Sequence, residues 1–190
     1  MTDLETKPLE DNVAKSDVEE EHKSDNAILN ETPNKSLMNL IQESFNNPII
    51  KGELLKTNIE ISPQMKTIIE RIIASNPNVF PDLEKAVQEI IKDNKIDSKD
   101  IPQLIVIVRM LYQLLSGFKD MKLNTNNTII LVSNVLKYLI HLMVLNDVIH
   151  INNKPEFFKE VDLLVDSCVG LLGFAKSIKP KGCLKKLFGI

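Results

Sequence analysis

The amino-acid sequence predicts an all-α protein, a compact bundle of about five or six helices, and three observations support this prediction. No stretch of useful length alternates apolar and polar residues, so strands are not expected. Six stretches instead repeat apolar residues at helical spacing. Residues 101–150 hold six charged side chains, so this segment must be buried in a core, a partner or a bilayer.

The first three helices are predicted from their apolar faces and their end signals. Leu37 to Phe45 has apolar spacing and is expected to end at Asn46-Asn47-Pro48. The next helix has Ser62 as its N-cap and Pro63 at its first position, and Asn76-Pro77 stops it. A third helix is expected to begin near Pro81. Its apolar side is formed by Leu83, Val87, Ile90 and Ile91.

The other three helices are more apolar. Asp100 and Gln103 form a capping-box pattern before a helix that runs to about Phe118. Another is expected from about Asn127 to Leu145, and the last from Pro155 to about Lys176. The central helix of these three has one polar stripe, which consists of Asn127, Asn134, Lys137 and His141. The last helix is predicted to bury Phe157, Val161, Leu164, Cys168, Leu171 and Ala175.

Charge divides the 190 residues into three parts. Residues 1–34 are acidic and poor in apolar residues, which predicts a disordered acidic tail. The predicted bundle, residues 35–176, is close to neutral. Residues 177–190 form a basic, Cys-containing tail, and the last fifteen residues hold five Lys and no acid.

The stretch from Ile129 to Ile149 is long enough to cross a bilayer. Lys137 stands near its centre, however, and a central Lys costs about 2.5–3.5 kcal/mol on insertion scales. The polar residues also share one stripe, which is typical of an amphipathic helix in a soluble bundle. We therefore expect a buried core helix with a narrow exposed stripe, and not a membrane span.

Composition and motifs favour no catalytic or metal site, and no cofactor is expected. The two Arg and the absence of a basic stripe on the bundle argue against nucleic-acid binding. Without a secretory signal in residues 1–25, we expect an intracellular, cytoplasmic protein. The acidic residues from Asp93 to Asp100 are not expected to form a calcium-binding loop. Ser98 stands where such a loop needs Gly, and Leu104 stands where it needs Glu.

Several single residues are expected to have structural roles. His141 is interpreted as a surface histidine, and Cys168 as a small buried hydrophobe. Asp162 and Asp166 are expected on a solvated face. Gly170 and Gly173 are expected where another helix approaches closely, with fraying of the helix as the alternative.

The C-terminal tail carries the one specific functional hint. Basic and apolar residues alternate there around a cysteine. Anionic lipid headgroups attract such basic clusters, and acylation of the cysteine would strengthen the contact with a membrane. The alternative is that the basic tail binds no partner. It could also contact an acidic partner protein or the acidic residues 1–34 of its own chain. The candidate contact residues are Lys179, Lys181, Cys183, Lys185, Lys186, Leu187 and Phe188.

Two local patterns carry a family resemblance that covers roughly residues 85–190. Lys95-Ile96-Asp97 and Asp100-Ile101-Pro102 precede an aliphatic helix, and Val165-Asp166-Ser167-Cys168 precedes the Lys- and Cys-rich end. This order resembles small all-helical proteins encoded by large double-stranded DNA viruses. The resemblance implies a viral origin and a virion or assembly component, and it implies no activity and no site residues.

Three functions are therefore left open. The preferred one is a non-enzymatic structural or interaction protein that binds a protein partner or itself and contacts a membrane peripherally. The second is a small helical enzyme or ligand-binding protein with a buried pocket. The third is a death-regulator-like helical bundle that binds a partner helix, although the absence of Trp rules out the Asn-Trp-Gly-Arg signature of the cellular family.

Overall fold

The structure is a computed structural model, and it describes residues 36–121 and 123–177. Seven α-helices and two short 3-10 turns make up the regular structure of this part, and no strand occurs in it. The all-α prediction is therefore confirmed. The predicted acidic tail and nearly all of the basic tail lie outside the described residues.

The N-terminal half contains four short helices: α1 (Leu37–Ser44), α2 (Pro48–Lys56), α3 (Pro63–Ser75) and α4 (Val79–Ile90). The predicted cap of α3 is confirmed, because the Ser62 hydroxyl accepts a hydrogen bond from the Met65 amide at 3.1 Å. The start predicted near Pro81 is two residues late. A helix tolerates Pro in its first turn, where the amide would have no intrahelical partner.

Helix α2 was not predicted. Asn46-Asn47-Pro48 ends α1 as expected, but the same residues also begin the next helix. The Asn47 side chain accepts a hydrogen bond from the Ile49 amide at 2.9 Å, and Pro48 occupies the first helical position. The short helix has one buried side chain, Leu54, so its sequence has no clear apolar face.

The C-terminal half contains η1 (Ser98–Asp100), α5 (Ile101–Ser116), η2 (Lys119–Met121), α6 (Thr125–Leu145) and α7 (Lys154–Ser177). The capping box predicted for Asp100 and Gln103 is wrong. Asp97 and Asp100 form it instead: Asp97 accepts from the Lys99 amide, and Asp100 accepts from the Asp97 amide, both at 2.8 Å. The box therefore stabilises η1, which leads directly into α5.

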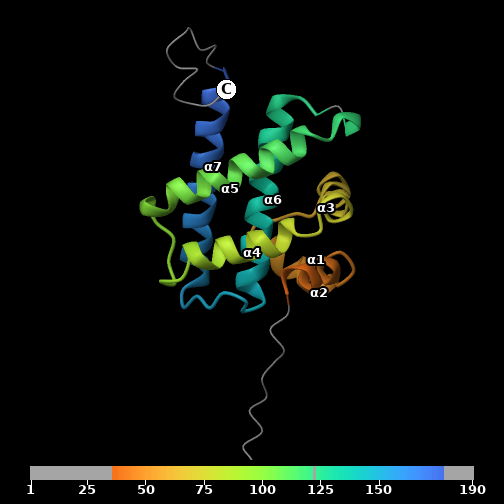
Figure 1. Ribbon diagram of the computed structural model, residues 1–190. Helices are drawn as coiled ribbons and strands as arrows, with labels where there is room; N and C mark the ends of the chain where they lie inside the picture. The colour runs from red at the N-terminus through yellow and green to blue at the C-terminus, as the bar shows by residue number, and fades with distance from the viewer. Residues whose placement is uncertain (1–35, 122, 178–190) are drawn as a thin grey trace, which may run out of the picture. The chain divides into compact units, whose positions relative to one another are not determined.

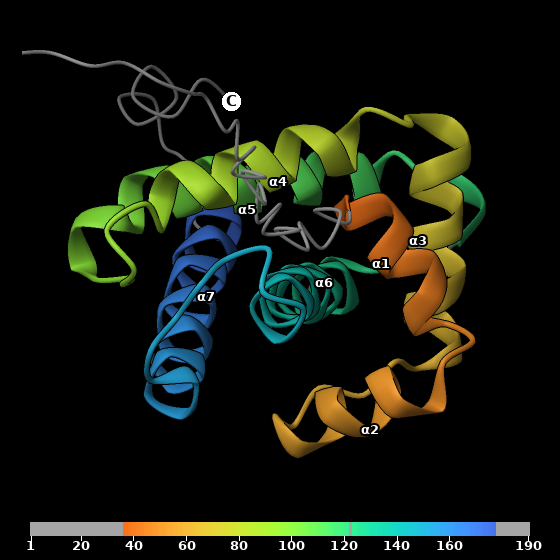
Figure 2. The same ribbon diagram turned by 90° about the horizontal axis from the view of Figure 1, so that it is seen from below.

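Helix α6 is the centre of the bundle. It packs against α1, α2, α3, α5 and α7, and Figure 2 shows it almost end-on with these helices around it. Helices α6 and α7 run side by side, and α5 crosses them (Figure 1). Tyr138 is the one Phe, Tyr or Trp residue of α6, and its hydroxyl forms a hydrogen bond with the Ser44 hydroxyl of α1 at 2.6 Å.

Candidate functional site

The candidate contact residues of the basic tail, Lys179 to Phe188, lie outside the described residues. The described part of the chain nevertheless contains two features that sequence reasoning missed. One is a polar cluster between α6 and α7, and the other is a set of exposed apolar side chains on α7.

The polar cluster is centred on Lys137, which lies near the middle of α6. Its ammonium is 2.8 Å from Asp166 Oδ2 and 3.9 Å from Asp162 Oδ1, and 14% of its side chain is exposed. The Ser133 hydroxyl donates to Asp166 Oδ1 at 2.7 Å. The prediction that both aspartates form a solvated face is therefore wrong for Asp162 and incomplete for Asp166, because each contacts α6.

His141 continues the cluster one turn further along α6. It is fully buried, so the prediction of a surface histidine is wrong. Its Nδ1 is 2.9 Å from the Thr57 hydroxyl at the end of α2, and its Nε2 is 3.4 Å from Asp162 Oδ1. The ring also stacks on Phe158 at 4.2 Å. His141 therefore connects α2, α6 and α7, and the unpredicted helix α2 contributes to its burial.

Burial shifts the pKa values of His141 and Asp162. It lowers the pKa of His141 to about 4, and the charge of Lys137 adds to this shift. Burial raises the pKa of Asp162, while Lys137 opposes the change. His141 Nε2 and Asp162 Oδ1 are both buried without a hydrogen-bond partner among the described residues. At neutral pH the histidine is therefore uncharged.

The Thr57 hydroxyl links His141 to the end of α2. It donates to the Leu54 carbonyl oxygen at 2.8 Å, and its oxygen lies 2.9 Å from His141 Nδ1. The other ring nitrogen, Nε2, faces Asp162 of α7 and not an open pocket. The ring of His141 is therefore enclosed by groups of three helices.

We predict that Lys137→Met lowers the free energy of unfolding by about 2 kcal/mol. The substitution leaves two neighbouring carboxylates without their shared cation, and one of them is partly buried. Urea denaturation at pH 7 measures the loss. Lys92→Met is the matched control, because Lys92 and Glu89 form an equally direct pair that is exposed on both sides. Equal stability of the two variants would contradict the prediction.

The expectations for Cys168 and Gly173 are confirmed. Cys168 is buried, its sulfur lies 3.9 Å from the Ile101 carbonyl oxygen, and burial raises the pKa of the thiol. A Cβ atom at Gly173 would lie 3.1 Å from Ile129 Cδ1, so α6 approaches closely there. Gly170 is different, since no described atom lies within 4 Å of such a Cβ position.

The outer face of α7 exposes large apolar side chains. Leu163 is 68% exposed, Leu171 53% and Phe174 67%. The prediction that Leu171 belongs to the buried face is therefore wrong. These side chains recur at positions 163, 171 and 174, which lie on one side of a helix of 3.6 residues per turn. We call Leu163, Leu171 and Phe174 the α7 outer face.

A surface depression of about 560 Å³ lies at the turn between α1 and α2. It is open to solvent, and its lining consists of Gln42, Glu43, Asn46, Asn47 and Pro48. A ligand pocket normally encloses most of its ligand among apolar side chains. This depression offers little support for the alternative of a buried ligand site.

No group of three or more His, Cys, Asp or Glu in the described part of the chain is arranged to hold a metal ion. Helix α6 is, by length and composition, apolar enough to cross a membrane, but 72% of its most apolar window is buried inside the protein. The core helix of a helical bundle has the same length and composition and is buried in the same way.

Comparison of the chain with protein-family models, with curated proteins and with solved structures found no match. The polar cluster joins α2, α6 and α7, and the α7 outer face exposes large apolar side chains.

Proposed function

We propose that the chain is a non-enzymatic helical interaction protein that binds a partner through the α7 outer face. The observation that carries this proposal is the exposure of Leu163, Leu171 and Phe174 on one helix. Single exposed apolar residues are common on protein surfaces, but several on one face favour an interaction site. The resemblance to viral helical proteins adds the proposal that the partner belongs to a virion or its assembly.

The polar groups of the bundle support the same proposal. Lys137, Asp162, Asp166 and His141 contact one another across helix interfaces, as expected of groups that stabilise packing. An acid–base catalyst needs a titratable group that can reach a substrate. The buried ring of His141 is directed toward Thr57 and Asp162, so it fits the structural role better.

Site-specific photo-cross-linking in the cells that contain the protein tests this proposal. Benzoylphenylalanine replaces Leu163 in one variant and Leu171 in another, and the adducts are identified by mass. Ile49 on α2 is the control position, because it is at least as exposed. We expect adducts from the two α7 positions, and we expect excess unlabelled protein to suppress them. Equal yields at all three positions would refute the proposal.

A further inference from the structure

Helix α2 buries little apolar surface against the bundle. Of its nine residues, all of which the structure describes, Leu54 is the one that is buried, and Ile50 packs partly against the core. Ile49 and Leu55 are exposed, and Figure 2 shows α2 at the edge of the bundle. A segment with so few buried apolar contacts opens locally at a lower free energy than the rest of a protein.

The end of α2 covers a buried histidine. Thr57, the C-cap residue of α2, places its hydroxyl 2.9 Å from Nδ1 of His141. The ring is fully buried, with Phe158 stacked on one face and Asp162 Oδ1 3.4 Å from Nε2. More than half of α6 is buried, so separating α6 from α7 exposes much more apolar surface than removing α2 does. Removal of α2 is therefore the least costly way for water to reach the ring.

The charges that face His141 come from α6 and α7. Lys137 lies one turn away on α6, 3.9 Å from Asp162 Oδ1 and 2.8 Å from Asp166 Oδ2. Asp162 already faces this ammonium, so it offsets only part of the cost of a second buried cation beside it. The contact from α2 is the neutral Thr57 hydroxyl. The charged residues of α2 are exposed or half-exposed and are Lys51, Glu53 and Lys56.

We propose that α2 is an acid-sensitive clamp, which protonation of His141 releases while α6 and α7 stay packed. Water then reaches the charged ring from the side that Thr57 covered, and Leu54 leaves the core. Non-helical residues 45–47 and 57–62 flank α2, so the movement leaves α1 and α3 in place. The clamp is independent of the proposed function, because it involves neither the α7 outer face nor its partner.

Amide hydrogen exchange of the full chain, followed by NMR and expressed as protection factors, tests the proposal. At pH 7.5 the amides of residues 51–57 should be less protected than those of residues 131–139 on α6. Between pH 7.5 and pH 5 the opening of α2 should increase about 10- to 25-fold. The upper value follows from a pKa of 6.5 for His141 in the open state and about 4 in the closed state. The raised pKa of Asp162 offsets part of the increase.

Low concentrations of urea distinguish release of α2 from unfolding of the whole bundle. The effect of urea on an opening reaction scales with the surface that the opening exposes. Urea should therefore accelerate exchange of the α6 amides and change exchange of the α2 amides little.

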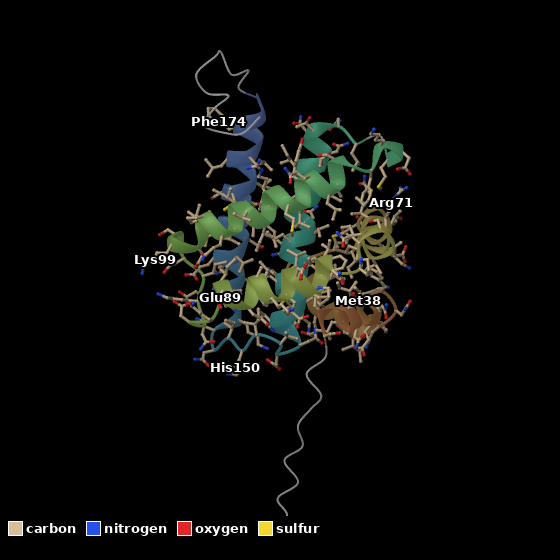
Figure 3. All side chains as sticks on the ribbon, in the orientation of Figure 1. Met38, Arg71, Glu89, Lys99, His150 and Phe174 are labelled. Atoms are coloured by element: carbon tan, nitrogen blue, oxygen red, sulfur yellow. The ribbon has the colours of Figure 1, made fainter. Side chains whose placement is uncertain are left out.

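Substitutions assign the effect to the two residues in contact. His141→Gln should remove most of the acid-induced increase. His150→Gln is its matched control, since it makes the same chemical change at an exposed position in the loop between α6 and α7 (Figure 3). Thr57→Val removes the hydroxyl and should increase the opening of α2 at pH 7.5 about fivefold. Thr67→Val, whose hydroxyl bonds the Pro63 carbonyl oxygen of its own helix, should leave α2 unchanged.

Two outcomes would overturn the proposal. The first is equal opening of the α2 and α6 amides at both pH values, which would mean that α2 leaves only when the bundle unfolds. The second is the full acid-induced increase in His141→Gln. The first comparison uses the unaltered protein alone, so it decides the proposal even if His141→Gln does not fold. Cross-linking from α7 tests the proposed function separately.

Discussion

Leu136→Ala should lower the free energy of unfolding by about 3–4 kcal/mol, because it removes a large side chain from the centre of the core. Leu136 is fully buried in α6. Neighbouring helices contact α6 from several sides, so the surrounding structure cannot collapse easily into the space that Ala leaves. A loss of this size is a large fraction of the stability of a typical domain.

Urea denaturation followed by circular dichroism at 222 nm (the α-helix signal) measures this effect. Leu163→Ala is the matched control, since it makes the same chemical change at an exposed position of α7. We expect the control to change the free energy of unfolding by less than about 0.5 kcal/mol. A loss below about 1 kcal/mol for Leu136→Ala would contradict the central position of α6.

Acidification should destabilise the protein by up to about 3 kcal/mol between pH 6.5 and pH 4 through His141 alone. Burial lowers the pKa of His141 in the folded protein to about 4, from 6.5 in the unfolded chain. Between these values the unfolded chain binds a proton that the folded protein does not. The stability associated with His141 is therefore complete above pH 6.5 and decreases as the pH falls toward 4.

The titration of Asp162 changes stability with pH in the opposite direction to that of His141. Burial raises its pKa, so the folded protein binds a proton more readily at this carboxyl than the unfolded chain does. Its ionisation lowers stability as the pH rises through the raised pKa, and its protonation offsets part of the loss in acid. The effect of His141 must therefore be measured as a difference between two proteins.

Denaturation from pH 7.5 to pH 4 for the unaltered protein and for His141→Gln isolates this difference. The variant should lose less stability in acid, because Gln does not titrate in this range. His150→Gln is the matched control, since it makes the same chemical change at an exposed position. The same pH dependence for His141→Gln and the unaltered protein would show that His141 does not titrate as its burial requires.

Much of the fold could be predicted from local signals. The positions of α1, α3, α5, α6 and α7 follow from apolar periodicity and from Ser and Pro at helix starts. Helix α2 was missed because Asn47-Pro48 is both a stop and a start signal, and because one buried residue leaves no periodicity to detect. The start of α6 was placed two residues late, since Asn124 is the N-cap and the helix begins at Thr125.

The candidate site could be predicted in part. The polar stripe on α6 was recognised, but it was interpreted as an exposed face. Its spacing shows that Lys137 and His141 lie on the same side of a helix, and it contains no information about which helix covers that side. The mutual contacts of Lys137, Asp162 and Asp166 depend on the register between α6 and α7, which neither helix specifies by itself.

The sequence by itself determined the all-α class, most of the helices, the core position of α6 and the buried state of Cys168. These properties depend on local periodicity and on the cost of exposing aliphatic side chains. The tertiary structure alone decided that His141 is buried and Leu171 exposed. The reason is physical: a helical repeat defines faces, but the burial of a face depends on the segments packed against it, which lie far away in the sequence.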